Sequence, residues 1–364
     1  MPEGLPNLLV KDIPPKSKYP ELKVNQPRIY YGELTDTHVI ANSKEKELDY
    51  PSDGENVYNS YSGTGGVQIK NLWRKFLFGW KFDGTRLLLS SYPTKESRIL
   101  FHRNIKERVK ILAPFLKYDD DPYIILVNGK LYWIIDAYTI SSDYPYSEPI
   151  YSQTAVQSLR RRLMLQAAET GQNLNGINYI RNSVKVVVDA YNGMVTFYIF
   201  EPDDPLINAW QSVFPNMFKS RDEILLEILA HIRYPSDMLL IQGAVYSKYH
   251  MTDPAVFYNQ EDLCVRATEK YYGATQLVQP YYIMWEPPDS DRAQFVLMLP
   301  FIPKDKQVLI AWIAGMCDPE NYGRLLAYKF PKEKRILGTQ QVETKIDQDP
   351  VLSGRLSLWD QRGS

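Results

Sequence analysis

Two similar stretches decide the fold that this sequence predicts: WIIDAYT at 133–139 and VVVDAYNG at 186–193. Each leads an apolar segment into Asp-Ala-Tyr, and an Asn-Gly pair stands close to each, at 128–129 and at 192–193. Asn-Gly favours the type I′ turn, because both turn residues adopt φ > 0 there. We therefore predict two β-hairpins, each closed by a two-residue turn.

The two-residue turn also fixes the register of the second hairpin. The cross-strand pairs that it predicts are Asp189 with Thr196, Tyr191 with Met194 and Val187 with Tyr198. Because side chains alternate along a strand, one face of each hairpin is apolar and the other carries polar and tyrosine side chains. We expect the apolar faces to form the core and the polar faces to be open to water or to a partner.

The polar faces supply the candidate binding residues. Tyrosine, of which the chain has 27 copies, suits half-buried contact surfaces because its apolar ring ends in a polar hydroxyl. The residues expected to contact a protein or peptide partner are Tyr132, Asp136, Tyr138, Asp189, Tyr191, Thr196 and Tyr198.

Hydrophobic periodicity extends the prediction to the rest of the chain. Helices are expected over 67–82, 94–116, 154–170, 219–235, 236–250 and 306–316, the first of them docked on a core. Strands are expected over 28–33 and 37–42 and in two pairs, 279–287 with 293–301 and 322–331 with 335–344, with a long loop at 44–66. Together these elements predict an α+β fold with mixed, mainly antiparallel sheets built from β-hairpins and with helices packed on one face.

The chain is expected to divide into three parts. Residues 1–27 hold six prolines and are expected to form an extended arm or linker. Residues 28–200 are expected to form an α+β unit that contains both Asn-Gly hairpins. Residues 201–364 are expected to form a second α+β unit that is cut short at its C-terminus, because Trp359 stands so near the end.

Composition and charge exclude some classes of function. The net charge is −1, and the sequence lacks the cluster of basic residues that binding to nucleic acid requires, so no nucleic-acid partner is predicted. No run of ~18 apolar residues occurs, so no segment of this chain is expected to cross a membrane. Cys264 and Cys317 permit one disulfide or two free thiols, and two free thiols are the commoner case.

Candidate reactive residues are few. The four histidines stand at no metal-ligand spacing, and no catalytic serine motif occurs. The glycine-rich stretch YSGTGG at 61–66 lacks the pattern of a phosphate-binding loop, so a flexible turn is favoured there.

Aspartates are the remaining candidates for chemistry. Asp119, Asp120 and Asp121 could bind Ca²⁺ through their clustered carboxylates, although Asp also favours the solvated ends of hairpins. Asp136 and Asp189 could act as a general acid and base. A hydrogen bond from each to a Thr or Tyr across the strand is the favoured interpretation.

Several long stretches of this sequence resemble a known family. They are RIYYGEL, SRILFHRNIKERV, DDDPYIILVNGKLYWIIDAYT, NYIRNSVKVVVDAYNG and LSLWDQRGS, and the likeness runs from Gly4 to Ser364. They resemble the extracytoplasmic region of an uncharacterised protein family (UPF) of large multi-pass bacterial membrane proteins. The resemblance implies that N-terminal helices absent from this chain anchor it in the cell membrane, with this region on the extracytoplasmic side. Members carry Trp where Cys264 stands, which implies that Cys264 belongs to no shared site.

The resemblance implies a location and an architecture but no activity. We expect a domain that binds partners or serves as a scaffold in the cell envelope, without catalysis and without a required cofactor. The first alternative is an envelope hydrolase or metal-dependent enzyme that uses Asp119–Asp121 with Asp136 or Asp189. The second alternative is a domain that regulates transport by the missing helices.

Overall fold

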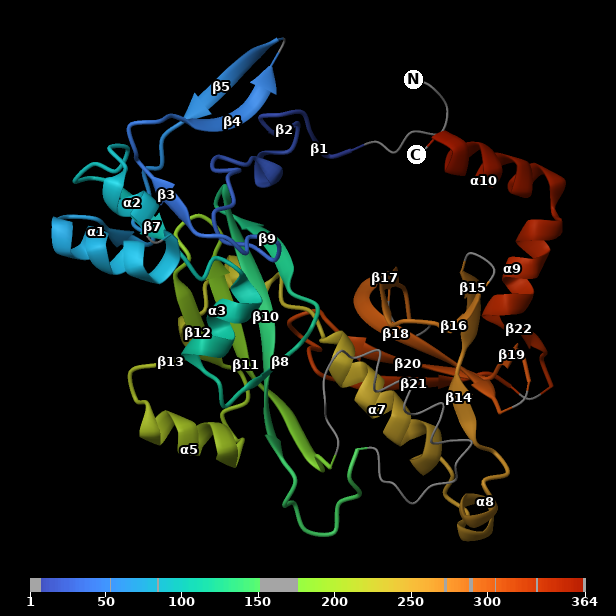
Figure 1. The fold of residues 1–364 in the computed structure, drawn as a ribbon. Coiled ribbons are helices and arrows are strands. Elements are labelled where there is room, and N and C mark those ends of the chain that lie inside the picture. Colours follow the sequence, from blue (N-terminus) through green and yellow to red (C-terminus); the bar gives the residue numbers. More distant parts are fainter. Residues whose placement is uncertain are drawn as a thin grey trace. The chain divides into compact units, whose positions relative to one another are not determined.

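The chain forms two compact units, each with its own sheet and core (Figure 1). The computed structural model describes residues 8–52, 54–83, 85–150, 176–271, 274–287, 291–304, 306–331 and 333–362. Unit 1 contains the described residues up to Ser147 together with Ile177–Ile228, and unit 2 contains the other described residues. The helix predicted over 154–170 lies outside the described residues.

Unit 1 is built around a six-stranded sheet. Its strands are β8 (Lys117–Tyr118), β9 (Tyr123–Val127), β10 (Lys130–Ser141), β11 (Tyr179–Asp189), β12 (Val195–Ile199) and β13 (Phe218–Ser220). They follow the order β13-β12-β11-β10-β8, and β9 also pairs with β10. The pairs are antiparallel except for β12 with β13, which confirms the predicted α+β class with mainly antiparallel sheets.

The first hairpin has the predicted turn. Val127 of β9 pairs with Lys130 of β10, which leaves Asn128 and Gly129 as the two turn residues. Their φ angles of 52° and 75° are both positive, as a type I′ turn requires. Asn25 N donates a hydrogen bond of 2.8 Å to the carbonyl oxygen of Gly129, so the predicted arm is attached to this turn near its end.

The second hairpin has a longer turn than predicted. Val188 of β11 pairs with Val195 of β12, and Asp189 N donates to the carbonyl oxygen of Met194 at 2.9 Å. The turn therefore has four residues, 190–193, and the predicted cross-strand pairs are wrong by two positions.

The Asp189 carboxylate explains this longer turn. It accepts hydrogen bonds from Tyr191 N and Asn192 N, which turns the chain before Asn-Gly is reached. Val187 consequently pairs with Thr196. A shift by two residues leaves every side chain on its predicted face, because strand side chains repeat with a period of two.

The apolar face of this sheet is the core of unit 1, as predicted. Two helices, α3 (Ile105–Leu112) and α5 (Pro205–Val213), supply the other side of that core (Figure 1). Buried core residues include Ile105, Val109, Ile207 and the alternate strand residues Ile135, Val186 and Phe197.

The chain before this sheet forms shorter elements at one end of unit 1 (Figure 1). They are β1 (Val10–Lys11), β2 (Lys16–Ser17), η1 (Pro20–Leu22), β3 (Val39–Ala41), β4 (Glu47–Ser52), β5 (Glu55–Asn59), β6 (Val67–Gln68), α1 (Leu72–Phe78), the π-helical η2 (Gly79–Asp83), α2 (Thr85–Leu89) and β7 (Arg98–Leu100). Strands β3, β7 and β6 form one small sheet, and β4 with β5 forms a hairpin.

Three predictions for this end are wrong. Residues 44–66 contain the β4–β5 hairpin, and the Asp-Gly pair at 53–54 is the turn signal that the loop prediction missed. Residues 28–33 form no strand, because Tyr30 N and Tyr31 N both donate to the carbonyl oxygen of Ala190. Residues 94–116 hold β7 and α3 instead of one helix.

The late start of α3 follows from its N-cap. The Asn104 side chain accepts a hydrogen bond from Glu107 N, which satisfies a free donor of the first helical turn and starts the helix at Ile105. Just before it, His102 has a φ of 47°, which is incompatible with a continuous helix.

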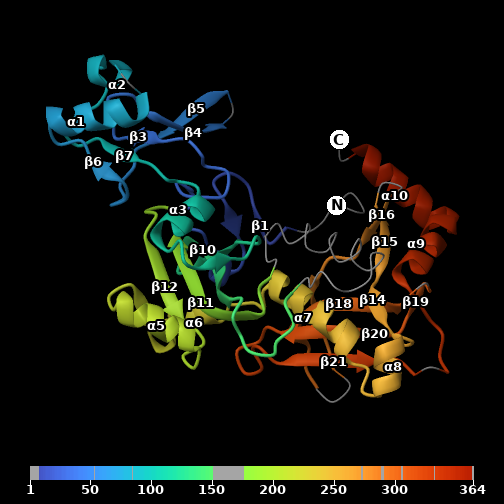
Figure 2. The ribbon, with the colours of Figure 1, turned by 60° about the horizontal axis from the view of Figure 1, so that its bottom comes forward.

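Unit 2 has a five-stranded sheet with a helix across one face. Its order is β14-β18-β20-β21, with β17 also paired to β18. Helix α7 (Ser236–Tyr249) was predicted over 236–250 and lies against β18 and β20 (Figure 2), where Gly243 faces Leu299 and Ile313. The strands are β14 (Cys264–Arg266), β17 (Tyr281–Trp285), β18 (Gln294–Pro303), β20 (Ala311–Met316) and β21 (Leu325–Lys329). The predicted pair 279–287 with 293–301 is confirmed as β17 and β18.

Smaller elements complete the chain. They are η3 (Arg221–Glu223), α6 (Leu226–Leu229), α8 (Pro254–Asn259), β15 (Thr268–Tyr271), β16 (Ala274–Leu277), β19 (Val308–Leu309), β22 (Ile336–Leu337), α9 (Thr339–Gln348) and α10 (Pro350–Arg362). β15 pairs with β16, and β19 pairs with β22.

Several predictions for the second half are wrong. Residues 306–316 form β19 and β20 instead of a helix, because β20 is buried along its whole length and its continuous apolar run has no strand period. Residues 335–344 contain β22 and the start of α9, and β21 pairs with β20 instead. Residues 219–235 hold the end of β13, then η3 and α6, instead of one helix, because Ile224 is extended and ends the first turn.

The boundary between the units also differs from the predicted one after residue 200. Helix α5 and strand β13 belong to unit 1. Ile207 of α5 and Phe218 of β13 are buried in its core, so packing carries the first unit past the second hairpin.

Candidate functional site

Asp136, on the predicted polar face of β10, is buried in an ion pair. Lys185 of β11 stands directly opposite, and its Nζ contacts Asp136 Oδ1. The two side chains are 0% (Lys185) and 3% (Asp136) exposed, and Asn182 Nδ2 donates to the same oxygen at 3.1 Å. The ammonium also lies 5.2 Å from the centre of the Phe200 ring. This carboxylate is therefore neutralised inside the protein.

The three consecutive aspartates before the first hairpin have separate roles. Tyr138 Oη donates to Asp119 Oδ2 in the interior, and Asp121 N donates to Asp119 Oδ1 at 2.9 Å. Asp120 and Asp121 are exposed. Within the described ranges, no group of three or more Asp, Glu, His or Cys side chains could hold a metal ion. The three carboxylates thus form no cage there, and Asp119 holds Tyr138 in place.

Asp189 closes its own turn. Besides Tyr191 N and Asn192 N, both at 2.8 Å, Asn192 Nδ2 donates to it at 3.0 Å. Tyr132 stands opposite Asp189 across the strands, and burial raises the pKa of Tyr132, with a further contribution from the Asp189 carboxylate. Asp136 lies four residues further along β10, so the structure does not bring the two aspartates together as an acid–base pair.

The remaining candidate residues are packed into unit 1. The Tyr191 ring lies 5.3 Å from that of Tyr30 and 5.0 Å from that of Tyr61, and its hydroxyl accepts a hydrogen bond from Ser62 N. Tyr198 is buried, and burial raises its pKa. Thr196 is half-buried.

The expectation that the polar face is open to water is therefore wrong for four of its seven candidate residues, whereas Tyr132, Tyr191 and Thr196 are half-buried. Asp136, Tyr138 and Tyr198 are buried, and Asp189 is 9% exposed. The physical reason is that the polar groups on this face satisfy one another across the strands, and a paired polar group tolerates burial.

The glycine-rich stretch 61–66 is held by the second hairpin. Thr64 N donates to Asn192 Oδ1 at 2.9 Å, and Gly65 N donates to Tyr61 Oη at 2.8 Å. A Cβ at Gly65 would lie 2.4 Å from the carbonyl oxygen of Asn192, so glycine is needed for this close approach. The stretch is a packed loop, which corrects the expected flexible turn.

Asp204 is a further buried carboxylate, and sequence reasoning considered it only as one of the clustered aspartates near the hairpin ends. Asp204 accepts hydrogen bonds of 2.6 Å each from Thr139, Ser183 and Tyr179. It also caps α5 through the backbone N–H groups of residues 206 and 207. Burial raises the pKa of Asp204, but these hydrogen bonds outweigh it and leave the pKa below its usual value. Asp followed by Pro at the start of a helix was the available signal.

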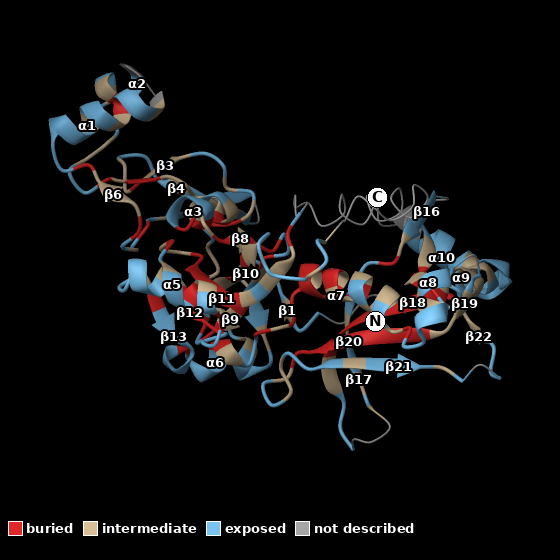
Figure 3. Cartoon of the chain, turned by 90° about the horizontal axis from the view of Figure 1, so that it is seen from below, coloured by how far each residue is buried: buried red, intermediate tan, exposed pale blue. Residues whose placement is uncertain are grey.

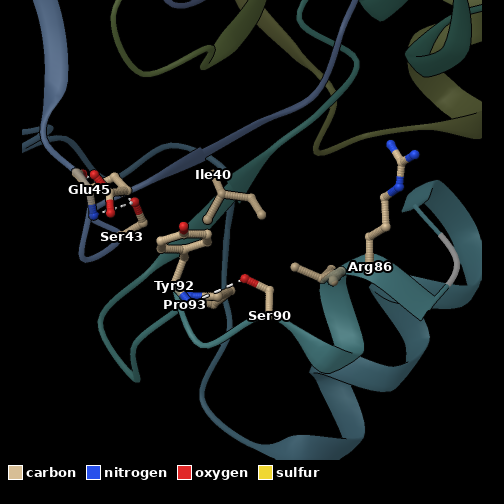
Figure 4. Close-up of a pocket in the computed structure, with 8 residues that line it drawn as sticks. Ile40, Ser43, Glu45, Arg86, Ser90, Tyr92 and Pro93 are labelled. Carbon is tan, nitrogen blue, oxygen red and sulfur yellow. Dashed lines mark hydrogen bonds between the residues drawn. The ribbon is translucent and has the colours of Figure 1, made fainter.

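A shallow pocket lies in unit 1 between β3 and α2. Its volume is about 420 Å³, and its lining residues are Ile40, Ser43, Glu45, Arg86, Leu87, Ser90, Tyr92 and Pro93. Figure 4 shows that the Arg86 guanidinium extends away from Tyr92 and Glu45. The charged groups therefore do not converge on one ligand position, as they do in specific small-molecule sites.

The most unusual surface of unit 1 is the stretch 70–86, called the aromatic–basic segment below. Helix α1 and η2 expose large apolar side chains, and Figure 3 colours much of α1 as exposed. The exposed fractions are 83% for Leu72, 66% for Trp73, 42% for Phe76, 47% for Leu77 and 82% for Trp80. Large contiguous apolar patches on a protein surface are often interaction surfaces.

The segment has a second apolar face, which holds it on unit 1. The rings of Phe78 and Phe82 lie 6.0 and 5.4 Å from that of Phe101, and Phe82 also stacks on His38. Only this face is docked, so the prediction of a helix whose apolar stripe is buried on a core is wrong for the tryptophans. The helix is apolar on both faces. The sequence shows this, but the apolar periodicity alone does not tell which face is buried.

The family comparison covers almost the whole chain. The sequence model of an uncharacterised protein family, UPF0182, matches residues 1–359. A UPF0182 protein of Trichodesmium erythraeum is 47% identical over 362 residues, which is 100% of this chain and 39% of that protein. A UPF0182 protein of Sulfurovum sp. is 46% identical over 363 residues, which is 100% of this chain and 37% of that protein. One from Methanospirillum hungatei is 44% identical, over 99% of this chain and 38% of its own length.

No solved structure matches the chain. Among the described residues, no helix has both the length and the apolar character that crossing a membrane requires.

Proposed function

Since the chain belongs to the uncharacterised protein family UPF0182 and spans only 36–42% of the length of its relatives, we propose that it is one region of a longer, membrane-anchored protein. This region faces the extracytoplasmic side and works by binding or scaffolding in the cell envelope. The relatives' extra length leaves room for the anchoring segments that the proposal requires.

The observation that carries the proposal is the exposed apolar side of the aromatic–basic segment. Trp73 and Trp80 are 66% and 82% exposed although tryptophan is among the most apolar side chains. Leaving them in water is unfavourable, and their contact with a partner would recover that free energy. The segment is a better binding candidate than the hairpin faces, which are largely buried.

The carboxylates support binding over hydrolysis. Asp136 is paired with Lys185, Asp119 accepts from Tyr138, and Asp189 accepts from its own turn. A general base needs a free lone pair within reach of a substrate, and a metal site needs converging ligands. These aspartates instead bind donors inside the protein, so we assign them a structural role.

Location is tested by thiol labelling of the full-length protein in intact cells. Cys264 and Cys317 are buried, and burial raises the pKa of Cys264 to about 12, so the native thiols of this region give a low background. Met194→Cys places a thiol directly after the second hairpin turn, at a residue that is 65% exposed. We expect a membrane-impermeant maleimide to label this variant in intact cells. We also expect the labelled protein to remain in the membrane fraction after a carbonate wash, because it is anchored. Labelling only after lysis would contradict the extracytoplasmic location.

Binding is tested in the same cells with a photo-activatable residue at position 73. We expect covalent adducts at position 73 because its side chain contacts a partner. The matched control is position 258, where Tyr258 is 87% exposed outside the segment and is expected to give none. Equal adduct yields at both positions would argue against a binding role for the segment.

A further inference from the structure

The exposed side of the aromatic–basic segment forms a continuous row. The Trp73 and Phe76 rings stack with centres 5.7 Å apart, and the Phe76 and Trp80 rings lie 6.5 Å apart. Leu72 and Leu77 of the same helix are also exposed. Because Phe78 and Phe82 hold the segment from its other side, the row projects from unit 1 as a fixed surface.

The segment also concentrates positive charge. Between residues 70 and 86 the sequence has five basic residues and one acidic residue, a local net charge of +4 in a chain whose net charge is −1. The basic residues are Lys70, Arg74, Lys75, Lys81 and Arg86. In the part of the chain that the structure describes, none of the five forms an ion pair with a carboxylate.

Three of these cations have contacts that orient them without neutralising them. Arg74 donates to the carbonyl oxygen of Gln68 at 3.0 Å, and Lys75 donates to that of Ser90 at 2.6 Å. Lys81 Nζ lies 5.3 Å from the centre of the Phe82 ring. The charges therefore remain available to an anionic partner.

This combination fits one partner better than others. Tryptophan is favoured at the boundary between phospholipid headgroups and acyl chains, because its ring is apolar and its N–H can donate a hydrogen bond. Lys and Arg around an apolar row attract anionic headgroups, and their apolar stems can follow the row into the interface. A surface of projecting rings, with cations that form no ion pair within the described part of the chain, is complementary to the anionic headgroup layer of a membrane.

We propose that the aromatic–basic segment lies on a bilayer that contains anionic phospholipids, with Trp73, Phe76 and Trp80 in the interface and the basic residues against phosphate groups. The inference rests on the proposed function, because it names the partner of the same surface. The bound segment lies in the plane of the membrane and does not cross it.

The apolar part is tested with the 364-residue chain and vesicles of phosphatidylcholine with or without phosphatidylglycerol. We expect the chain to partition onto the anionic vesicles, and Trp73→Ala/Trp80→Ala to lower its partition coefficient by roughly a hundredfold. The control Tyr146→Ala/Tyr258→Ala removes two exposed rings outside the segment and is expected to change little.

The charge part is tested with Lys70→Glu/Arg86→Glu. We expect a loss of more than about tenfold on anionic vesicles and little change on neutral ones, because each cation near an anionic surface contributes about 1 kcal/mol. Lys334→Glu/Lys345→Glu is the matched control, since both of its lysines are exposed in unit 2.

Two outcomes would overturn the inference. One is the absence of partitioning onto anionic vesicles, and the other is equal partitioning of the unmodified chain and the double tryptophan variant. If that variant does not fold, brominated acyl chains decide instead, because they must quench tryptophan emission of the unmodified chain when the segment is inserted. A photo-adduct at position 73 with a protein, together with no vesicle binding, would leave the proposed function standing and remove the bilayer as its partner.

Discussion

At the scale of single residues, Lys185 supplies the cation that faces the buried carboxylate of Asp136. Both side chains are almost fully buried, and Asp136 lies between Lys185 and Asn182. We expect Lys185→Met to lower the free energy of unfolding of unit 1 by about 3–5 kcal/mol, because it leaves a buried carboxylate without its cation. Urea unfolding followed by circular dichroism measures the change.

A double variant separates the charge effect from the loss of packing. Lys185→Met/Asp136→Leu removes both charges and is expected to recover most of the lost stability, since an apolar pair of similar volume packs without a desolvation penalty. Lys130→Met, on the exposed start of β10, is the control and is expected to change stability by less than about 0.5 kcal/mol. A single variant as stable as the parent would mean that Asp136 is adequately solvated by other groups.

The same residues limit what could be predicted about the candidate site. Asp136 and Asp189 stand in identical Asp-Ala-Tyr words, yet one pairs with a lysine 49 positions away and the other caps its own turn. The local cap at Asp189 is within reach of sequence reasoning, because Asp bonds to backbone two residues on. The Asp136–Lys185 pair depends on strand register across a long connection, which no local pattern fixes.

At the scale of elements, Asp204 couples the start of α5 to the sheet. It accepts from Thr139 and Ser183 while it caps the helix. We expect Asp204→Asn to lower stability at neutral pH by about 1–3 kcal/mol, because an amide nitrogen would face some of these donors. The lowered pKa of Asp204 means that its contribution is present above the unfolded-state pKa of ~4 and is lost as pH falls through the lower folded-state pKa.

The pH dependence is therefore the test of that role. Unfolding measured from pH 7 down to pH 3 should give a gap between parent and Asp204→Asn that narrows below about pH 4. Asp253→Asn is a matched control, because Asp253 caps α8 on the surface and accepts only from backbone N–H groups. A gap that stays constant with pH would show that ionised Asp204 is not what stabilises the start of α5.

Elements also show which parts of the fold were predictable. Asn128-Gly129 fixed the first hairpin locally, and Pro235 with the following apolar pattern located α7. The helix predicted over 306–316 is a central strand, since burial on both faces removes the period that distinguishes strand from helix. The helix predicted within 67–82 was found, but its predicted docking was wrong for a different reason. A helix with two apolar faces gives no sequence signal for which face packs on the core.

At the scale of the whole molecule, the chain has two separately cored units, so damage to one should not spread to the other. Ile135 is buried in the core of unit 1, and Ile313 is buried in the sheet of unit 2. Replacing either by Ala creates a cavity, with an expected cost of about 2–5 kcal/mol. We expect Ile135→Ala to speed amide hydrogen exchange in β11 and β12 but not in β18 and β20, and Ile313→Ala to do the reverse.

Each variant serves as the control for the other, because both make the same chemical change at a buried strand position. Exchange followed by mass spectrometry of peptides from all four strands reads both units in one sample. Faster exchange in all four strands for either variant would mean that the units open as one cooperative body. Faster exchange confined to the altered unit would instead mean that the two units open independently. The aromatic–basic segment of unit 1 could then be altered without disturbing unit 2, as a binding surface that acts on its own requires.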